Sequence, residues 1–228
     1  MRNIMVRLVG LLLFCVLLCS AEHATALMGR RLRPVPQLSK VPLTQALQWI
    51  GGSLDDDFIC FGVELDPAEP MVNIDFPEGG TVARDLGLLF QQLPKYEYAA
   101  VSEHLISVHP RGAIANPSDV LNTVVKDFNV AGVRAGEIMA WPEIYISELQ
   151  SPASKPRVVI AVGPMGVGPP VTLHLQGLTV REVLNAVSIA TENAPDDELP
   201  LGWASNGRIL VTAPGNWKAL HVREKLRR

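Results

Sequence analysis

The fold is decided by residues 171–212, whose sequence is VTLHLQGLTVREVLNAVSIATENAPDDELPLGWASNGRILVT. The first residues alternate between apolar and polar types, which predicts a half-buried strand over 171–175. Thr179 follows as a good N-cap, and Glu182 three residues later completes the pattern of a capping box. Apolar residues then recur at helical spacing, at Val180, Val183, Leu184, Val187 and Ala190.

A hairpin is expected at the end of the same stretch. Two apolar runs, 201–204 and 208–212, flank Ser205-Asn206-Gly207. Because Asn-Gly favours the positive φ angles of a tight hairpin turn, the two runs are predicted to pair antiparallel. The stretch as a whole predicts a strand, a helix and two further strands, and it holds no recognisable catalytic arrangement.

The same plan recurs along the chain. Four segments lead from a strand end, through a small or polar turn, into a helix: 37–47, 75–86, 129–138 and 174–184. Their identities match loosely, but the pattern is consistent, with a period of about 35–50 residues. We interpret them as four related units, two in each half of the chain.

The elements expected from this pattern are as follows. In the first half we expect a helix over 41–50, strands over 58–65 and 72–76, a helix over 81–93, and a hairpin of 96–100 with 104–109. In the second half we expect strands over 124–130, 157–162 and 171–175, and a helix over 133–149 that Trp141-Pro142 splits.

These units predict an α+β fold with two small β-α-β-type sandwich domains, each a small mixed sheet with two helices on one face. Strand–helix–strand units within one sheet should give parallel neighbours. The expected layout is a signal peptide (1–26), a linker (27–36), a first domain (37–110), a linker (111–119), a second domain (120–214) and a basic tail (215–228).

Composition and charge exclude some classes of function. The chain has 228 residues, 48% of them hydrophobic, which suits one larger or two small domains. Its net charge of −3 is too small to indicate a surface for nucleic acid.

The N-terminus predicts export. Arg2 and Arg7 accompany an apolar run, 8–18, and Ala24-Thr25-Ala26 offers a cleavage site after Ala26. The run is shorter than the roughly 20 residues that a spanning helix needs. Cys19 could suggest a lipoprotein, but Leu18 is not the small residue that usually precedes a lipidated cysteine. The sequence therefore favours a periplasmic or secreted protein.

Cleavage after Ala26 leaves Cys60 as the one thiol. Without a second cysteine no disulfide forms within the chain. Cys60 lies in an apolar, strand-like run, and the neighbouring Asp55-Asp56-Asp57 would raise its pKa. A buried, unreactive side chain is expected, although pairing between two chains stays open.

With these elements in view, residues 37–110 resemble the short N-terminal domain of secretins and TonB-dependent receptors. The resemblance rests on Leu43-x-x-Ala46-Leu47, Val72-x-Ile74-x-Phe76 and Thr81-Val82 with Leu86 and Leu89. Residues 120–214 resemble the same family best over 171–212. The resemblance implies a periplasmic, non-enzymatic interaction module, here in tandem and with no barrel or secretin core after it.

The sequence offers no catalytic, cofactor-binding or metal site that we would assign. The histidines His104, His109, His174 and His221 have no metal-ligand spacing. Asp55-Asp56-Asp57 and Pro195-Asp196-Asp197-Glu198 are expected to be solvated loops. The glycine-rich segment 163–170 leads into a strand and lacks Gly-Lys-Ser/Thr, so it does not suggest phosphate binding. The tail has basic residues that could touch anionic lipid, but a solvated end is expected.

Two hypotheses of function remain beside a purely structural envelope role. The first is an envelope interaction module whose protein partner adds a strand to a sheet edge or docks on the helix-free face. The second is a small-ligand protein or enzyme with a site between the halves. For the second, Trp141, Trp203, Tyr98 and Glu143 are the candidate lining residues.

Overall fold

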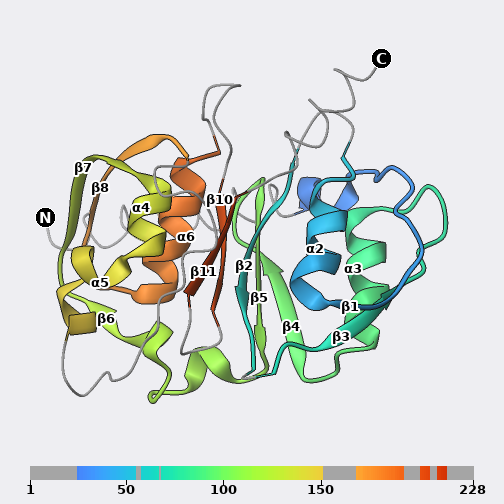
Figure 1. Cartoon of the computed structure of the whole chain (residues 1–228), viewed down its shortest axis with the longest axis horizontal. Helices are drawn as coiled ribbons and strands as arrows, with labels where there is room; N and C mark the ends of the chain where they lie inside the picture. The colour runs from blue at the N-terminus through green and yellow to red at the C-terminus, as the bar shows by residue number, and fades with distance from the viewer. Residues whose placement is uncertain are drawn as a thin grey trace, which may run out of the picture.

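A five-stranded sheet runs through the middle of the molecule in the computed structural model, between two pairs of helices (Figure 1). Its strand order is β11 (Leu210–Pro214), β10 (Leu201–Ser205), β2 (Cys60–Glu64), β5 (Leu105–Pro110) and β4 (Tyr96–Ala100). The pairs β10–β2 and β2–β5 are parallel, and the two outer pairs are antiparallel. Strands from both halves of the chain therefore share this sheet.

The structure describes residues 25–54, 58–66, 68–150, 168–192, 201–205 and 210–214. Several predictions concern residues outside these ranges. They are most of the signal peptide, Asp55-Asp56-Asp57, the strand over 157–162, Pro195-Asp196-Asp197-Glu198 and the basic tail.

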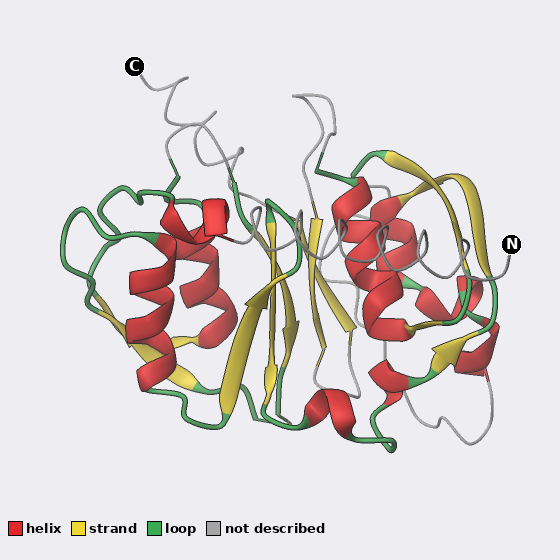
Figure 2. Cartoon of the chain, turned by 180° about the vertical axis from the view of Figure 1, so that it is seen from behind, coloured by secondary structure: helices red, strands yellow, loops and turns green. Residues whose placement is uncertain are grey.

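Each face of the central sheet carries a helix pair, and each helix pair is covered by a two-stranded sheet (Figures 1 and 2). In the first half the helices are α2 (Leu43–Gly51) and α3 (Val82–Gln91), and the outer strands are β1 (Leu38–Pro42) and β3 (Met71–Ile74). In the second half they are α4 (Ala135–Ala140) and α6 (Val180–Ala190), with β7 (Phe128–Arg134) and β8 (Pro170–Leu175) outside. The molecule is thus a stack of five layers, strand–helix–strand–helix–strand.

Short elements complete the described chain. A connector, residues 111–123, joins the halves and contains two 3₁₀ turns, η1 (Ala113–Ala115) and η2 (Val120–Asn122). The short strands β6 (Val124–Val125) and β9 (Leu178–Thr179) pair antiparallel. The helical turns α5 (Pro142–Tyr145) and η3 (Ser147–Gln150) follow α4.

Local sequence signals account for the first half. The Thr81 hydroxyl accepts a hydrogen bond from the Arg84 backbone N–H at 3.3 Å and so begins α3 as an N-cap. The helix α2 begins after Pro42, and the side chain that caps it comes from another segment of the chain. Glu69 Oε1 accepts hydrogen bonds from the backbone N–H of Thr44 (2.7 Å) and from the Thr44 hydroxyl (2.5 Å). The apolar faces of both helices are buried in one core with strands β2, β3 and β5.

The predicted linker over 27–36 belongs to this core instead. Leu27, Leu32 and Val35 are buried, and Arg31 forms a β-bridge with Thr81. The prolines and basic residues suggested a loose segment, but the three apolar side chains between them supply enough buried surface to fix it on the first half.

In the second half, the expected helix over 133–149 is split. The strand β7 extends to Arg134, α4 ends at Ala140, and α5 begins at Pro142, as the Trp141-Pro142 pair predicts. The expected single strand over 124–130 is wrong, because β6 and β7 are separate strands with different partners. The pairing of β7 with β8 contains a bulge between Val130 and Val133, where Gly132 has a φ of 66°. A bulge of this kind bends the strand that carries it.

The α+β class is confirmed, and two details of the expected architecture differ. The strands that flank α2, α3 and α6 lie in different sheets, and the parallel pairs join β2 to β5 and β10 and do not join successive strands. The helix-free face is not available over β2 and β5 either, because α6 of the second half contacts both strands. Two separate sandwiches are not confirmed, although the predicted domain limits stay a prediction.

Candidate functional site

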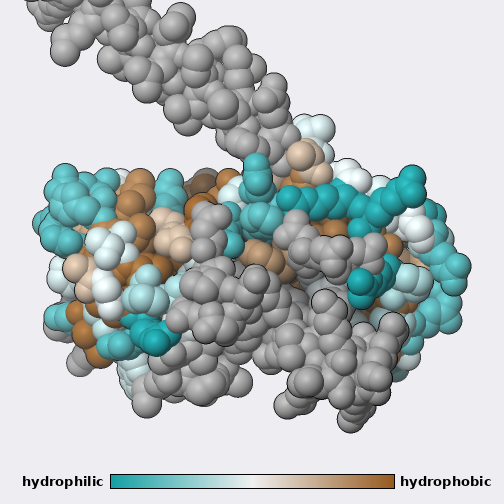
Figure 3. Space-filling model, turned by 90° about the horizontal axis from the view of Figure 1, so that it is seen from above, coloured by the Kyte–Doolittle hydropathy of each residue, from teal (hydrophilic) through white to brown (hydrophobic). Residues whose placement is uncertain are grey.

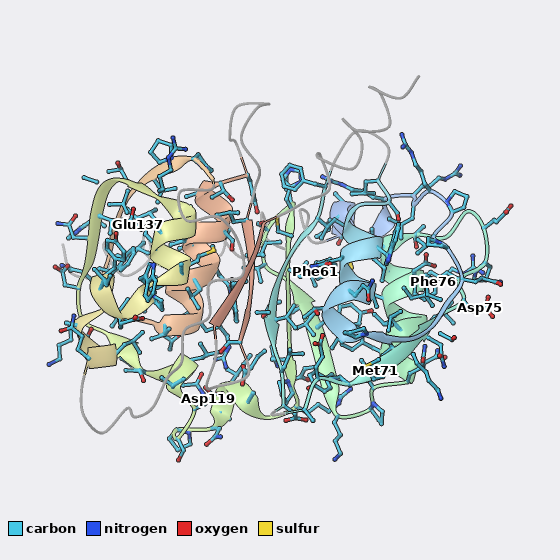
Figure 4. The ribbon with its side chains drawn as sticks, viewed as in Figure 1. Phe61, Met71, Asp75, Phe76, Asp119 and Glu137 are labelled. Atoms are coloured by element: carbon cyan, nitrogen blue, oxygen red, sulfur yellow. The ribbon has the colours of Figure 1, made fainter. Side chains whose placement is uncertain are left out.

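The two halves meet along a seam, which we define as β2, β10 and the side of α6 that lies on them. Every residue of β2 is buried, because the strand has covered side chains on both faces. Phe61 and Val63 belong to the core of the first half, and Figure 4 shows Phe61 on the α2 side of the strand. The intervening residues, Cys60, Gly62 and Glu64, face α6.

The centre of the seam is closed by an indole ring. Trp203 on β10 is 1% exposed, and its Nε1 donates to Asn185 Oδ1 on α6 at 2.9 Å. A Cβ on Gly62 would lie 2.7 Å from the indole and 2.9 Å from Asn185 Oδ1. The missing side chain at Gly62 therefore makes room for the tryptophan between the sheet and the helix.

The side of α6 in the seam is polar and buried. Arg181, Asn185 and Ser188 are 5%, 9% and 1% exposed, and Glu192 continues the same stripe just beyond the helix end. The apolar stripe predicted from the sequence is also buried, in the core of the second half. The burial of the polar stripe could not be predicted from the sequence, because polar residues at helical spacing ordinarily indicate a solvated face.

At one end of the seam lies a charged group that we call the Arg181 cluster: Arg181, Glu64, Asp119 and Asn122. Arg181 Nη2 is 2.5 Å from Glu64 Oε2 and 3.6 Å from Asp119 Oδ2, and Nη1 donates to Asn122 Oδ1. The side chains of Arg181, Glu64 and Asp119 are only 7%, 9% and 11% exposed. Figure 4 shows Asp119 on the connector, between the two halves.

The environment of this cluster favours a neutral Glu64. Burial, followed by a hydrogen bond with Asp119, raises the pKa of Glu64 to about 7, against the opposing effect of Arg181. Among the described residues Arg181 Nε has no hydrogen-bond partner. The connector, expected to be a linker over 111–119, is held here by the side chains of Asp119 and Asn122.

The other end of the seam contains Ser102, His104 and Glu192. The Ser102 hydroxyl donates to Glu192 Oε1 and accepts from the backbone N–H groups of His104 (3.2 Å) and Leu105 (3.0 Å). The His104 ring stacks on Phe58 with 4.8 Å between centroids. The Ser102 hydroxyl therefore links the β4–β5 turn to Glu192, just beyond the end of α6.

Cys60 is buried between these two ends, as predicted. It is 2% exposed and packs with Phe58, Leu105 and Ile189. Burial raises the pKa of its thiol, and the charge of Glu192 adds to that effect.

The four residues proposed to line a cleft are not brought together. Trp203 fills the seam, whereas Tyr98 packs on Phe90, with 4.7 Å between ring centroids, in the core of the first half. Trp141 lies at the end of α4, and Glu143 lies on α5. This placement gives the hypothesis of a site between the halves no support.

The histidines are also dispersed. His109 is buried beside Glu97, with 3.5 Å between Nδ1 and Oε1, and His174 is exposed on β8 as expected. Within the described ranges no group of three or more His, Cys, Asp or Glu residues is arranged to hold a metal ion. His221 lies outside those ranges.

One sheet edge stands out as a candidate interaction site, and we call it the β4 edge. In the described chain β4 stands at one end of the central sheet and pairs with β5 alone. Val101 N–H donates to Leu105 O and Arg111 N–H donates to Lys95 O, so the odd-numbered residues of β4 point their backbone groups at β5. The backbone N–H and C=O groups of Tyr98 and Ala100 consequently point away from the sheet.

The β4 edge is more regular than the outer edges. Five consecutive residue pairs join β4 to β5 without a register shift. Both outer sheets contain an irregularity, in β1 next to Lys40 (φ 55°) and in β7 at Gly132. Bulges discourage further pairing, whereas a regular edge is a template for it.

Hydrophobic residues also reach the surface elsewhere in the described chain. In the view from above, the hydrophobic residues that reach the surface lie among hydrophilic ones (Figure 3). The large exposed apolar side chains come from different elements: Trp49, Met71, Val101, Ile114, Val124 and Ile144. Scattered residues of this kind are normal for a protein surface.

Comparisons with known proteins add no identification. No protein-family model, no curated protein and no solved structure matches this chain. Among the helices that the structure describes, none has the length and apolar character needed to cross a membrane.

Proposed function

We propose that this protein is an exported, non-catalytic interaction module of the cell envelope, of the secretin and TonB-receptor short N-terminal type. Its partner would be an envelope protein that adds an extended strand at the β4 edge. The observation that carries the proposal is the regular, unbulged ladder of β4 with the outward backbone groups of Tyr98 and Ala100.

Export is the second part of the proposal, and it rests on the N-terminal sequence. The basic residues, the short apolar run and Ala24-Thr25-Ala26 are the features of a cleaved signal peptide.

The β4 edge also offers apolar surface to an added strand. Tyr98 and Ala100 are partly buried and pack against the first core. A strand paired with β4 would place alternate side chains on the same face and cover what remains exposed of both residues. Backbone hydrogen bonds would supply affinity, and these side-chain contacts would supply selectivity.

The proposal is tested by capturing partners from an envelope extract of the source organism with residues 27–228 as bait. Ala100→Pro removes the outward N–H while leaving the odd-numbered ladder bonds to β5 in place. Ala100→Thr also enlarges the side chain but keeps that N–H. We expect one envelope protein to be recovered by the wild type and by Ala100→Thr and to be lost with Ala100→Pro.

Thermal unfolding of both variants checks that the fold is retained. If no protein is recovered above the level on an unrelated bait, the interaction function is contradicted. If Ala100→Pro is folded and recovers the same protein as the wild type, the β4 edge is not the binding site.

A further inference from the structure

The Arg181 cluster joins three segments that are distant in the sequence. Glu64 comes from β2 of the first half, Arg181 from α6 of the second half, and Asp119 from the connector between them. One guanidinium nitrogen, Nη2, lies within 4 Å of both carboxylates, at 2.5 Å and 3.6 Å. The cluster therefore fastens the two halves and the connector at a single point.

The charges in this cluster do not balance when all groups are ionised. One guanidinium faces two carboxylates, which leaves one negative charge in a place where the three side chains are 7%, 9% and 11% exposed. A buried charge without a counter-charge is strongly unfavourable, and a carboxyl group relieves it by binding a proton. The Arg181 charge itself cannot be removed in a protein.

We propose that the Arg181 cluster is a proton-operated latch, which holds the two halves together most firmly when the Glu64–Asp119 pair binds one proton. With one proton bound, the remaining carboxylate balances the guanidinium, and the protonated carboxyl can donate a hydrogen bond to its neighbour. When the proton leaves, the same place holds an excess negative charge and the seam opens more readily.

Four titratable or charged groups face Glu64 from the elements packed around it. The titratable or charged groups that face it are Arg181 from α6, Asp119 from the connector and Tyr96 from β4. His109 from β5 is the fourth, because it is the next position after the Val63–Val108 pair in the β2–β5 register. Burial raises the pKa of Tyr96. Burial also raises the pKa of Glu64, to about 7.

The direction of the pH effect follows from the raised pKa of Glu64. In an open or unfolded seam the carboxyl group returns to its ordinary value of 4.5, so between 4.5 and about 7 the closed state holds a proton that the open state does not. Acid therefore favours the closed seam. Each increase of one pH unit within this window lowers the equilibrium constant for closing by up to about tenfold. Above that window the equilibrium stays at its weaker level.

The thiol of Cys60 reports the opening of the seam, because this residue of β2 is buried and Ile189 of α6 packs against its cluster. The experiment uses the full chain with Cys15 and Cys19 replaced by serine. The rate of labelling by a thiol reagent is divided by the rate for the unfolded chain at the same pH, which corrects for thiolate formation. Wild type, Glu64→Gln and the exposed-site control Glu78→Gln are compared across the window.

We expect the protection of the Cys60 thiol in the wild type and in Glu78→Gln to fall by up to about tenfold per pH unit as pH rises from about 5 to about 7. Glu64→Gln imitates the protonated carboxyl, so its pH slope should be clearly smaller than that of the wild type, and its protection should equal or exceed that of the wild type at the upper pH. The slope that remains comes from Glu192, whose pKa is also raised by burial in the seam.

Two results overturn the proposal. One is a Glu64→Gln protein with the same pH slope as the wild type. The other is a Glu64→Gln protein that loses more protection at the upper pH than at the lower, which is the behaviour of an ordinary ion pair. If Glu64→Gln fails to fold, Asp119→Asn takes its place and should likewise reduce the slope, because it also leaves one carboxylate for one guanidinium.

Discussion

Gly62 and Gly202 set the distance between the two halves at the level of single residues. A Cβ on Gly62 would lie 2.7 Å from the Trp203 indole, and a Cβ on Gly202 would lie 2.6 Å from the Phe61 carbonyl oxygen. Neither contact leaves space for a side chain. The parallel pairing of β2 with β10 therefore depends on two positions without a Cβ, one on each strand.

Substitution of Gly62 by alanine should destabilise the protein by about 1–3 kcal/mol, because the added methyl group displaces a fully packed indole. The matched control is Gly87→Ala in α3, where a Cβ meets nothing within 4 Å. That change should stabilise the protein by about 0.5–1 kcal/mol, since alanine is the better helix former. Urea denaturation of the two variants gives both values, and a Gly62→Ala protein as stable as the wild type would contradict the packing described for the seam.

Individual residues differed in how far the sequence could predict them. The roles of Thr179 as a cap and of Cys60 as a buried side chain depend on residues close in sequence, and both were predicted. Arg181 and Asp119 could not be placed, because their partners come from segments about sixty to over a hundred residues away in the chain, a coupling that no local pattern encodes.

At the scale of elements, α6 is the helix that holds the second half to the first. Its apolar stripe is buried in the second core, and its polar stripe is buried in the seam. The predicted capping box is present at its start, where Glu182 N–H donates to Thr179 Oγ1 at 3.3 Å and Thr179 N–H donates to Glu182 Oε2 at 2.7 Å. The first turn that carries Arg181 is therefore fixed by its own cap.

Thr179→Ala removes one side of this cap and should lower the free energy of unfolding by about 1 kcal/mol. Thr179→Ser keeps the hydroxyl and should remain close to the wild type. Thermal or urea unfolding distinguishes the two. Equal losses in both variants would show that the methyl group of Thr179, and not its hydroxyl, stabilises the start of α6.

Most elements were predictable from local patterns, and the exceptions have physical reasons. The helix α3 and the hairpin of β4 and β5 lie where apolar periodicity and turn residues indicated. The strand over 124–130 was wrong because Lys126 and Asp127 separate two strands that pair with different partners. The segment over 27–36 was misinterpreted because prolines and arginines hid three buried apolar residues.

At the scale of the whole molecule, strands from the two halves form one central sheet. Residues 58–63 contain no charged or hydroxyl-bearing side chain, a composition typical of a strand that is buried on both faces. That pattern could have predicted a second covering layer over β2, but it could not identify the layer as α6. Repeated units in one chain suggest separate domains, whereas here β10 of the second half pairs with β2 of the first.

This arrangement also decides where a partner can bind. Joining the halves uses the edge of β2, and the bulges in β1 and β7 make the outer edges irregular. The β4 edge lies at the end of the central sheet away from β10 and β11. Among the described strands, β4 and β11 are the two ends of the central sheet, and both pair with their neighbour over five residues without a register shift. We propose β4 as the edge for another protein, because Tyr98 and Ala100 offer partly buried apolar surface there.

Residue-resolved amide hydrogen exchange of β4, with and without the captured partner, tests this account most directly. In the free protein the amides of Glu97 and Ala99 should exchange slowly, because they bond to β5, and those of Tyr98 and Ala100 should exchange fast. Binding of the partner should slow exchange at Tyr98 and Ala100 and leave Glu97 and Ala99 unchanged. A partner that binds without slowing exchange at Tyr98 and Ala100 would contradict strand addition at the β4 edge.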